Sequence, residues 1–248
     1  MIKFFRHIRQ NLIMENKTSK YFKYAIGEII LVVIGILIAL QINNWNEVKK
    51  LEEKTQEYYV QLLDDLDKDV SFAHQIIEKF DNYLNDLATY TNSYYQDSVL
   101  MPEEAYKQIS ELPVLSTSFT FNSSTIETLQ SSGDINLIPS EIRNRLIDLK
   151  RQQELTIIRA NYTNEGKNAI IQNLNPLLGS TTLIDRLKHQ PVMNEFLKID
   201  ENLREVLLVY EGVHRWKSVS EQESVSNFQD MLKEIDTIMR LINTELKE

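Results

Sequence analysis

The side chains that could support catalysis or metal binding in this chain lie mostly on predicted helices. Glu211 and His214 are three residues apart, which places a carboxylate and an imidazole on one helix face, as in helical di-iron proteins. Such centres need two motifs of this kind and two further glutamates, and the chain has one motif. His74 and Glu78 also have ligand-compatible spacing, but surface pairs of this kind are common. We therefore predict no metal site and no cofactor.

An acidic run from Asp64 to Asp69 is a second candidate, because its alternating aspartates resemble the start of an EF-hand calcium loop. Val70 stands where that loop needs glycine, and Ile76 stands where it needs a bidentate glutamate. We interpret the run as a solvent-exposed face of a long helix.

Nucleophile and phosphate-binding motifs are absent from the sequence. It contains no Gly-x-Ser-x-Gly, no Ser-x-x-Lys and no glycine-rich phosphate loop, and its zero cysteines exclude thiolate chemistry and disulfides. We predict that the protein is not an enzyme. An enzyme of unfamiliar type stays open as an alternative.

The least helical stretch, Val114–Ser124, is rich in hydroxyl side chains, and Phe119 and Phe121 alternate within it. We predict an interaction site around these two phenylalanines and the turn that begins at Gly133 and Asp134, because helices stop there and side chains converge. The alternative is that the two phenylalanines close one end of the hydrophobic core.

Helix-end signals flank this stretch. Ser124 followed by Glu127 reads as a capping box, and Gly133 suits the C-terminal cap, so we expect a short helix over Thr125–Ser132. Pro102 and Pro113 bracket another short helix around Glu103–Glu111.

Three long amphipathic helices must position these residues. Apolar residues recur at helical spacing from Val48 to Tyr94, from Ser140 to about Ile170, and from Leu203 to Leu246. In the second helix the apolar positions are Ile142, Leu146, Leu149, Leu155, Ile158, Tyr162, Ala169 and Ile170. Short helical pieces are expected at Leu183–Leu187 and Val192–Lys198. The pattern predicts an all-α protein in which three long helices form an antiparallel bundle.

An apolar segment precedes these helices. Residues 25–45 would form a helix about 30 Å long, which matches the hydrocarbon core of a bilayer. No small-x-small cleavage pattern follows it, so we expect a retained signal anchor rather than a cleaved signal peptide. No glycine or proline stands between Gly35 and Pro102, and the span is expected to continue into the bundle.

Charge is divided unevenly around this segment. Residues 1–28 hold six of the 27 Lys and Arg residues and two of the 36 Asp and Glu residues, so they carry a charge of +4 and the remainder carries −13. Orientation follows from the basic residues alone: six Lys and Arg residues precede the span, whereas only Lys49, Lys50 and Lys54 closely follow it. The positive-inside rule therefore places the N-terminus in the cytoplasm and the bundle outside it. The acidic remainder argues against nucleic acid as a partner, and the lipid bilayer is the first expected partner.

Within the span, Gly35 and Ala39 form a small-xxx-small pair that would allow two helices to approach closely. Glu28 and Trp45 mark the expected membrane boundaries. Chance pairs of small residues are common, so association of this helix remains a hypothesis.

Two blocks of sequence resemble a known family. The first block covers residues 1–47 and has KYAIGEIILVVIGILIALQINNWNE at its centre, where polar residues stand at fixed places around an apolar run. The second block is STIETLQSSGDINLIPSEIRNRLIDL at residues 124–149. Both are similar to a bacterial family of single-span membrane proteins of unknown function. The resemblance implies a topology in the bacterial inner membrane and implies no activity, substrate or catalytic residues.

The sequence therefore predicts three regions: a basic amphipathic cytoplasmic tail at residues 1–24, a transmembrane helix at 25–45 and an extracytoplasmic helical bundle at 46–248. We expect the bundle to act as an interaction or sensing module, with a protein partner or a second copy of the chain. A structural anchor or assembly subunit of an envelope complex is the alternative.

Overall fold

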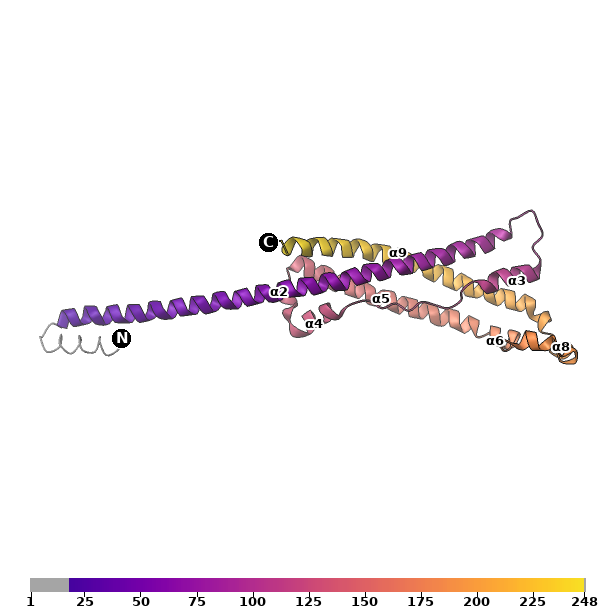
Figure 1. The fold of residues 1–248 in the computed structure, drawn as a ribbon, viewed down its shortest axis with the longest axis horizontal. Coiled ribbons are helices and arrows are strands. Elements are labelled where there is room, and N and C mark those ends of the chain that lie inside the picture. Colours follow the sequence, from indigo (N-terminus) through magenta and orange to yellow (C-terminus); the bar gives the residue numbers. More distant parts are fainter. Residues whose placement is uncertain (1–17, 248) are drawn as a thin grey trace. The chain divides into compact units, whose positions relative to one another are not determined.

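The computed structural model describes residues 18–247, and every regular element in this range is a helix (Figure 1). The elements are α2 (Thr18–Ser93), α3 (Pro102–Glu111), α4 (Ser124–Ser132), η1 (Asp134–Leu137), α5 (Ser140–Ile171), α6 (Leu174–Leu178), α7 (Leu183–Leu187), α8 (Pro191–Leu197), η2 (Ile199–Asn202) and α9 (Leu203–Glu245). The predicted all-α class is confirmed. The predicted amphipathic tail lies largely outside the described residues.

The chain divides into two compact units, with the boundary between Glu57 and Tyr58. In the first unit, ten large apolar side chains between Ile29 and Leu40 are each 47–65% exposed. Among the described residues one helix is long and apolar enough to cross a membrane, judged by length and composition. The apolar segment is the part of α2 that meets this criterion.

The predicted boundary and association residues lie on this same part of α2. Gly35 and Ala39 are both exposed, four residues apart on one face. Trp45 is exposed as well, and the Lys49 ammonium lies 6.0 Å from its ring centroid. Glu28 is half-buried.

The second unit is built on three long helices: α2 from Tyr58 onward, α5 and α9. α5 and α9 run in opposite directions, because Arg145 pairs with Glu234, Arg159 pairs with Glu223 and Gly166 meets the Trp216 ring. Their shared core is a continuous cluster of buried apolar side chains: Tyr58, Tyr59, Leu62, Leu66, Ala73, Ile76, Phe80, Ile126, Leu129, Ile138, Ile142, Leu146, Leu149, Phe228, Met231, Ile235, Ile238 and Ile242.

Helix boundaries agree with the signals in the sequence. α3 begins with Pro102 in its first turn, where a missing N–H costs nothing. α4 ends at Gly133, whose φ of 80° is a left-handed conformation that favours glycine. The short helices predicted at Leu183–Leu187 and after Pro191 are also present.

One expectation about α5 is wrong. The apolar pattern of this amphipathic helix includes Leu155, Ile158, Tyr162 and Ala169, but all four are exposed. Beyond Leu149 the buried positions are instead Gln153, Thr156, Ala160 and Lys167. One face of α5 is buried along the helix, but its side chains change from apolar to mostly polar after Leu149. The four apolar side chains therefore lie on the exposed face, and apolar periodicity alone predicts the wrong buried residues.

Candidate functional site

The non-helical stretch between α3 and α4 lies within the second unit. We call residues 112–123 the crossing segment (Figure 1). It was predicted to be the least helical part of the chain, and that prediction is confirmed. It carries Phe119 and Phe121, the two phenylalanines of the predicted interaction site.

Both phenylalanines pack against the hydrophobic core. Phe119 and Phe121 lie 5.0 and 5.7 Å from the fully buried ring of Phe228, measured between ring centroids. Phe121 also meets Phe72 edge to face at 5.9 Å. This geometry agrees with the alternative that the two rings close the core.

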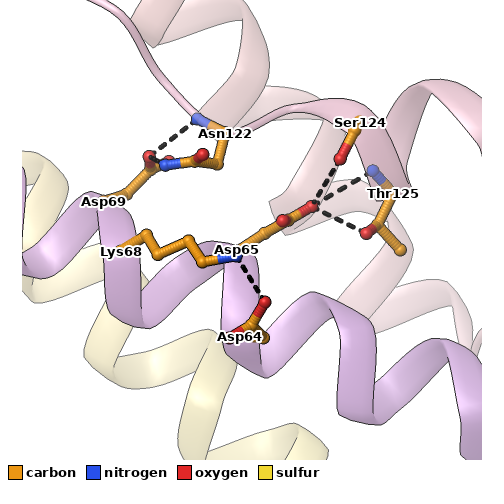
Figure 2. Close-up of polar contacts among 7 residues, drawn as sticks. All are labelled: Asp64, Asp65, Lys68, Asp69, Asn122, Ser124 and Thr125. Atoms are coloured by element: carbon orange, nitrogen blue, oxygen red, sulfur yellow. Dashed lines mark hydrogen bonds and ion pairs between the residues drawn. The ribbon is translucent and has the colours of Figure 1, made fainter.

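Asp65 on α2 binds the first turn of α4, directly after the crossing segment (Figure 2). Its Oδ2 accepts hydrogen bonds from the Thr125 backbone N–H at 3.1 Å, from the Thr125 hydroxyl at 2.7 Å and from the Ser124 hydroxyl at 3.2 Å. A carboxylate from another helix thus accepts from the first turn of α4, where backbone N–H groups lack intrahelical partners. The predicted capping box at Ser124 is wrong, and the Glu127 carboxylate accepts from Ser123 instead.

Asp69, one turn further along α2, is 1% exposed. Its Oδ1 accepts from the Asn122 backbone N–H at 2.7 Å and from the Asn122 side-chain amide at 2.8 Å. Its Oδ2 accepts from the Gln153 amide of α5 at 2.8 Å. Burial raises the pKa of the Asp69 carboxyl, and these hydrogen bonds act against that rise.

The acidic run therefore has two roles. Asp64 and Asp67 are exposed as predicted, and the Asp64 carboxylate lies 2.5 Å from the Lys68 ammonium (Figure 2). For Asp65 and Asp69 the prediction of a solvent-exposed face is wrong, because both are buried: Asp65 binds the start of α4 and Asp69 binds Asn122 of the crossing segment. Their spacing of four residues puts the two carboxylates on one helix face.

Two buried lysines hold the other end of the crossing segment. The Lys167 ammonium of α5 donates to the Val114 carbonyl at 2.5 Å and to the Ser116 hydroxyl. The Lys217 ammonium of α9 donates to the Leu115 carbonyl at 3.3 Å and to the Glu221 carboxylate. Two successive backbone carbonyls are thus bound by cations from two different helices.

Burial is the largest cause of the pKa shifts of Lys167 and Glu221. It lowers the pKa of Lys167 to about 8, and the nearby Lys217 charge adds to that effect. Burial raises the pKa of Glu221, while Lys217 opposes the rise. Thr117 and Glu221 line a cavity of about 20 Å³, which is large enough for one water molecule.

His214 is buried beside this lysine group. Its Nδ1 lies 3.1 Å from the Tyr83 hydroxyl of α2, and the Lys217 ammonium lies 4.3 Å from the Tyr83 ring centroid. Burial lowers the pKa of His214 to about 4, and the Lys217 and Lys167 charges act in the same direction while the Ile109 carbonyl opposes them. The imidazole is therefore neutral at neutral pH.

Glu211 does not join His214 in a shared site. Its carboxylate accepts from the Tyr90 hydroxyl at 2.6 Å. Across residues 18–247, no group of three or more His, Cys, Asp or Glu side chains is arranged to hold a metal ion. Glu211 and His214 instead make two separate contacts between α9 and α2, with Tyr90 and Tyr83 respectively.

The predicted turn at Gly133 and Asp134 is likewise held in place by side chains. The Asp134 carboxylate accepts from the Tyr58 hydroxyl at 2.7 Å and from the Ser132 hydroxyl at 2.8 Å. The turn is thereby fixed to α2.

A protein-family model matches residues 28–166, which is more than half of the chain, and describes a family of unknown function, DUF6090. The chain belongs to this family. The predicted resemblance to a family of unknown function is confirmed. No curated protein and no solved structure matches the chain.

The region that defines DUF6090 membership contains one of the two polar groups in full. Asp65, Asp69 and the residues that they bind all lie between positions 28 and 166, whereas Lys167, Lys217 and Glu221 lie beyond it. The matched region therefore contains both partners of the aspartate contacts, whereas of the lysine contacts it contains Val114, Leu115 and Ser116 but not the two lysines.

The sequence carried a partial signal for the groups that it did not predict. Lys217 and Ser224 occupy core-face positions in the periodic pattern of the last helix, and both are buried. A charged residue at a core position indicates a buried partner. Nothing in the sequence pointed to the carbonyls of Val114 and Leu115 as those partners.

Proposed function

We propose that this protein is a single-span protein of the bacterial inner membrane whose helical domain acts outside the cytoplasm as an interaction or sensing module. The observation that carries the proposal is the exposed apolar segment between Ile29 and Leu40. Moving ten half-exposed aliphatic side chains from water into hydrocarbon is favourable by on the order of 10 kcal/mol. A bilayer supplies that environment along about 20 helical residues.

The distribution of basic residues supports the orientation. Six Lys and Arg residues precede the span, and three follow it closely, at Lys49, Lys50 and Lys54. Under the positive-inside rule the N-terminus stays in the cytoplasm. The acidic bundle then lies on the other side, as an antiparallel extracytoplasmic domain.

The buried titratable side chains favour a binding role over catalysis, because their hydrogen bonds are made to other parts of the fold. Asp69, Lys167 and Lys217 bind backbone or side-chain groups of the crossing segment, and Asp65 binds the first turn of α4 that follows it. Such contacts fix the fold and leave these groups engaged. We therefore propose that the domain is not an enzyme.

An assembly subunit of an envelope complex is the second candidate, and the outer face of α5 and α9 favours it. Ile158, Tyr162 and Val219 are 60–72% exposed. Ile158 and Tyr162 lie within one turn of Arg159 on α5, and Val219 lies one turn before Glu223 on α9. Arg159 and Glu223 form an ion pair between the two helices. Exposed apolar side chains gathered on neighbouring helices are typical of protein interfaces.

Reporter fusions test the topology. A phosphatase reporter that is active only outside the cytoplasm should be active after Lys50 and after Glu248. Activity of a cytoplasm-specific reporter at both positions would overturn the proposal.

Photo-crosslinking in native membranes tests the second candidate. A crosslinker at Tyr162 should retrieve one stoichiometric partner if the protein is an assembly subunit, while one at the exposed Lys233 serves as the control. Equal products at both positions would count against an interface on this face.

A further inference from the structure

A pocket of about 450 Å³ opens in the second unit where α3, α6, α7, η2 and α9 meet. This volume lies within the range of small-molecule sites in proteins. Its apolar wall is formed by Leu178, Ile184, Ile199, Leu203 and Val206. No function assigned so far uses this pocket.

Specific contacts hold the walls in place. The Asn202 side-chain amide donates to the Leu177 carbonyl at 2.9 Å, which ties η2 to α6. The rings of Tyr106 and Tyr210 meet edge to face at 6.2 Å, which ties α3 to α9. α6 ends at Gly179, whose φ of 68° lets the chain turn towards α7. The pocket is therefore a formed feature of the folded domain.

The charged residues that line the pocket are all acidic. Glu103 and Asp200 line it, and no lysine or arginine does. Neither carboxylate forms an ion pair within the part of the chain that the structure describes. The aromatic ring of Tyr106 lines the same space, and aromatic rings attract organic cations.

We propose that this pocket binds an organic cation with an apolar body, of the aryl- or alkylammonium class. The apolar wall would take the hydrocarbon part, while Glu103, Asp200 and the Tyr106 ring attract the charged head. A neutral ligand would leave both carboxylates without a counter-charge, and an anion would be repelled. The inference rests on the proposed function, because it names the ligand class of the binding module.

The test uses the full chain in nanodiscs of zwitterionic lipid and three probes of similar size: benzyltrimethylammonium, benzyl alcohol and phenylacetate. Binding is measured by calorimetry against empty nanodiscs. We expect the cation to bind about fivefold or more tightly than either other probe, because exposed charge pairs contribute up to about fivefold each. Its affinity should fall with added salt.

Three variants locate the site. The double variant E103Q/D200N should weaken benzyltrimethylammonium binding about tenfold and leave benzyl alcohol binding unchanged. Glu104→Gln is the matched control, because Glu104 is the next residue on α3 and does not line this pocket. Ile184→Trp, at a half-exposed wall position, should block all three probes without unfolding the domain.

Equal affinity for the three probes, no binding of the cation, or an unchanged affinity in either pocket variant would overturn the inference. The binding results and the topology reported by the fusions are independent of each other. If fusions place the domain outside the cytoplasm and no probe binds, only the ligand class fails. If the cation binds and the fusions report a cytoplasmic domain, the proposed topology fails and the pocket remains.

Discussion

Replacing Asp65 with alanine tests whether a carboxylate of α2 holds the first turn of α4. The substitution removes the acceptor of three hydrogen bonds, one of them from the backbone N–H of Thr125, which is a buried residue. A buried donor left without a partner costs about 1–3 kcal/mol, and loss of a helix N-terminal cap costs about 1 kcal/mol. The two effects overlap, so we expect D65A to lower the free energy of unfolding by about 2–3 kcal/mol.

Urea unfolding of the full chain in nanodiscs, followed by circular dichroism, measures this difference. Asp64→Ala is the matched control, because Asp64 is the preceding residue and forms an exposed ion pair with Lys68. Pairs of that kind contribute about 0.3–0.5 kcal/mol. Asp65→Asn keeps an oxygen acceptor but loses the charge, and it should fall between the two alanine variants.

If D65A and D64A agree within about 0.5 kcal/mol, the reasoning is refuted, since it distinguishes the two positions by their burial and hydrogen bonds alone. A domain of ordinary stability, about 5–15 kcal/mol, would still be folded after the expected loss. The comparison can therefore be made on folded protein.

Three further predictions concern the core, the pH dependence and the turn after α4. Phe228→Ala should destabilise the bundle by about 3–5 kcal/mol because the fully buried ring contacts three others, whereas exposed Phe196→Ala should change stability by less than about 0.5 kcal/mol in the same urea assay. His214 has its pKa lowered to about 4, so the unfolded chain binds the additional proton between pH 6.5 and 4 and the free energy of unfolding should fall by up to about 3 kcal/mol as pH drops through that window. Gly133→Ala should cost about 1–2 kcal/mol of thermal stability because φ is 80°, and Gly133→Asn should cost less.

A different result would contradict each of these three predictions. Similar losses for the two phenylalanine variants would mean that the core does not depend on the Phe228 ring. The pH slope should shrink in a His214→Gln variant, and an unchanged slope would assign it to other groups. Equal stability of the alanine and wild-type proteins at position 133 would contradict a left-handed cap.

Local signals in the sequence located most of the helices. Apolar periodicity and helix-end residues such as Pro102 and Gly133 placed the elements to within a few residues, because caps and breakers act over one turn. The same reasoning failed on the face of α5, where Leu155 and Tyr162 are exposed and Lys167 is buried. Which face is buried depends on what packs against it, and this is not a local property.

The candidate site shows the same division. The sequence by itself determined that residues 114–124 leave the helical pattern and that an apolar segment long enough to span a bilayer lies near the N-terminus, since both follow from composition over a short window. Only the tertiary structure decided that Asp65, Asp69, Lys167 and Lys217 face inward to bind that stretch and the start of α4. A buried charge is stable only beside groups that satisfy it, and here those groups lie about 50–100 residues away along the chain, where no sequence pattern connects them.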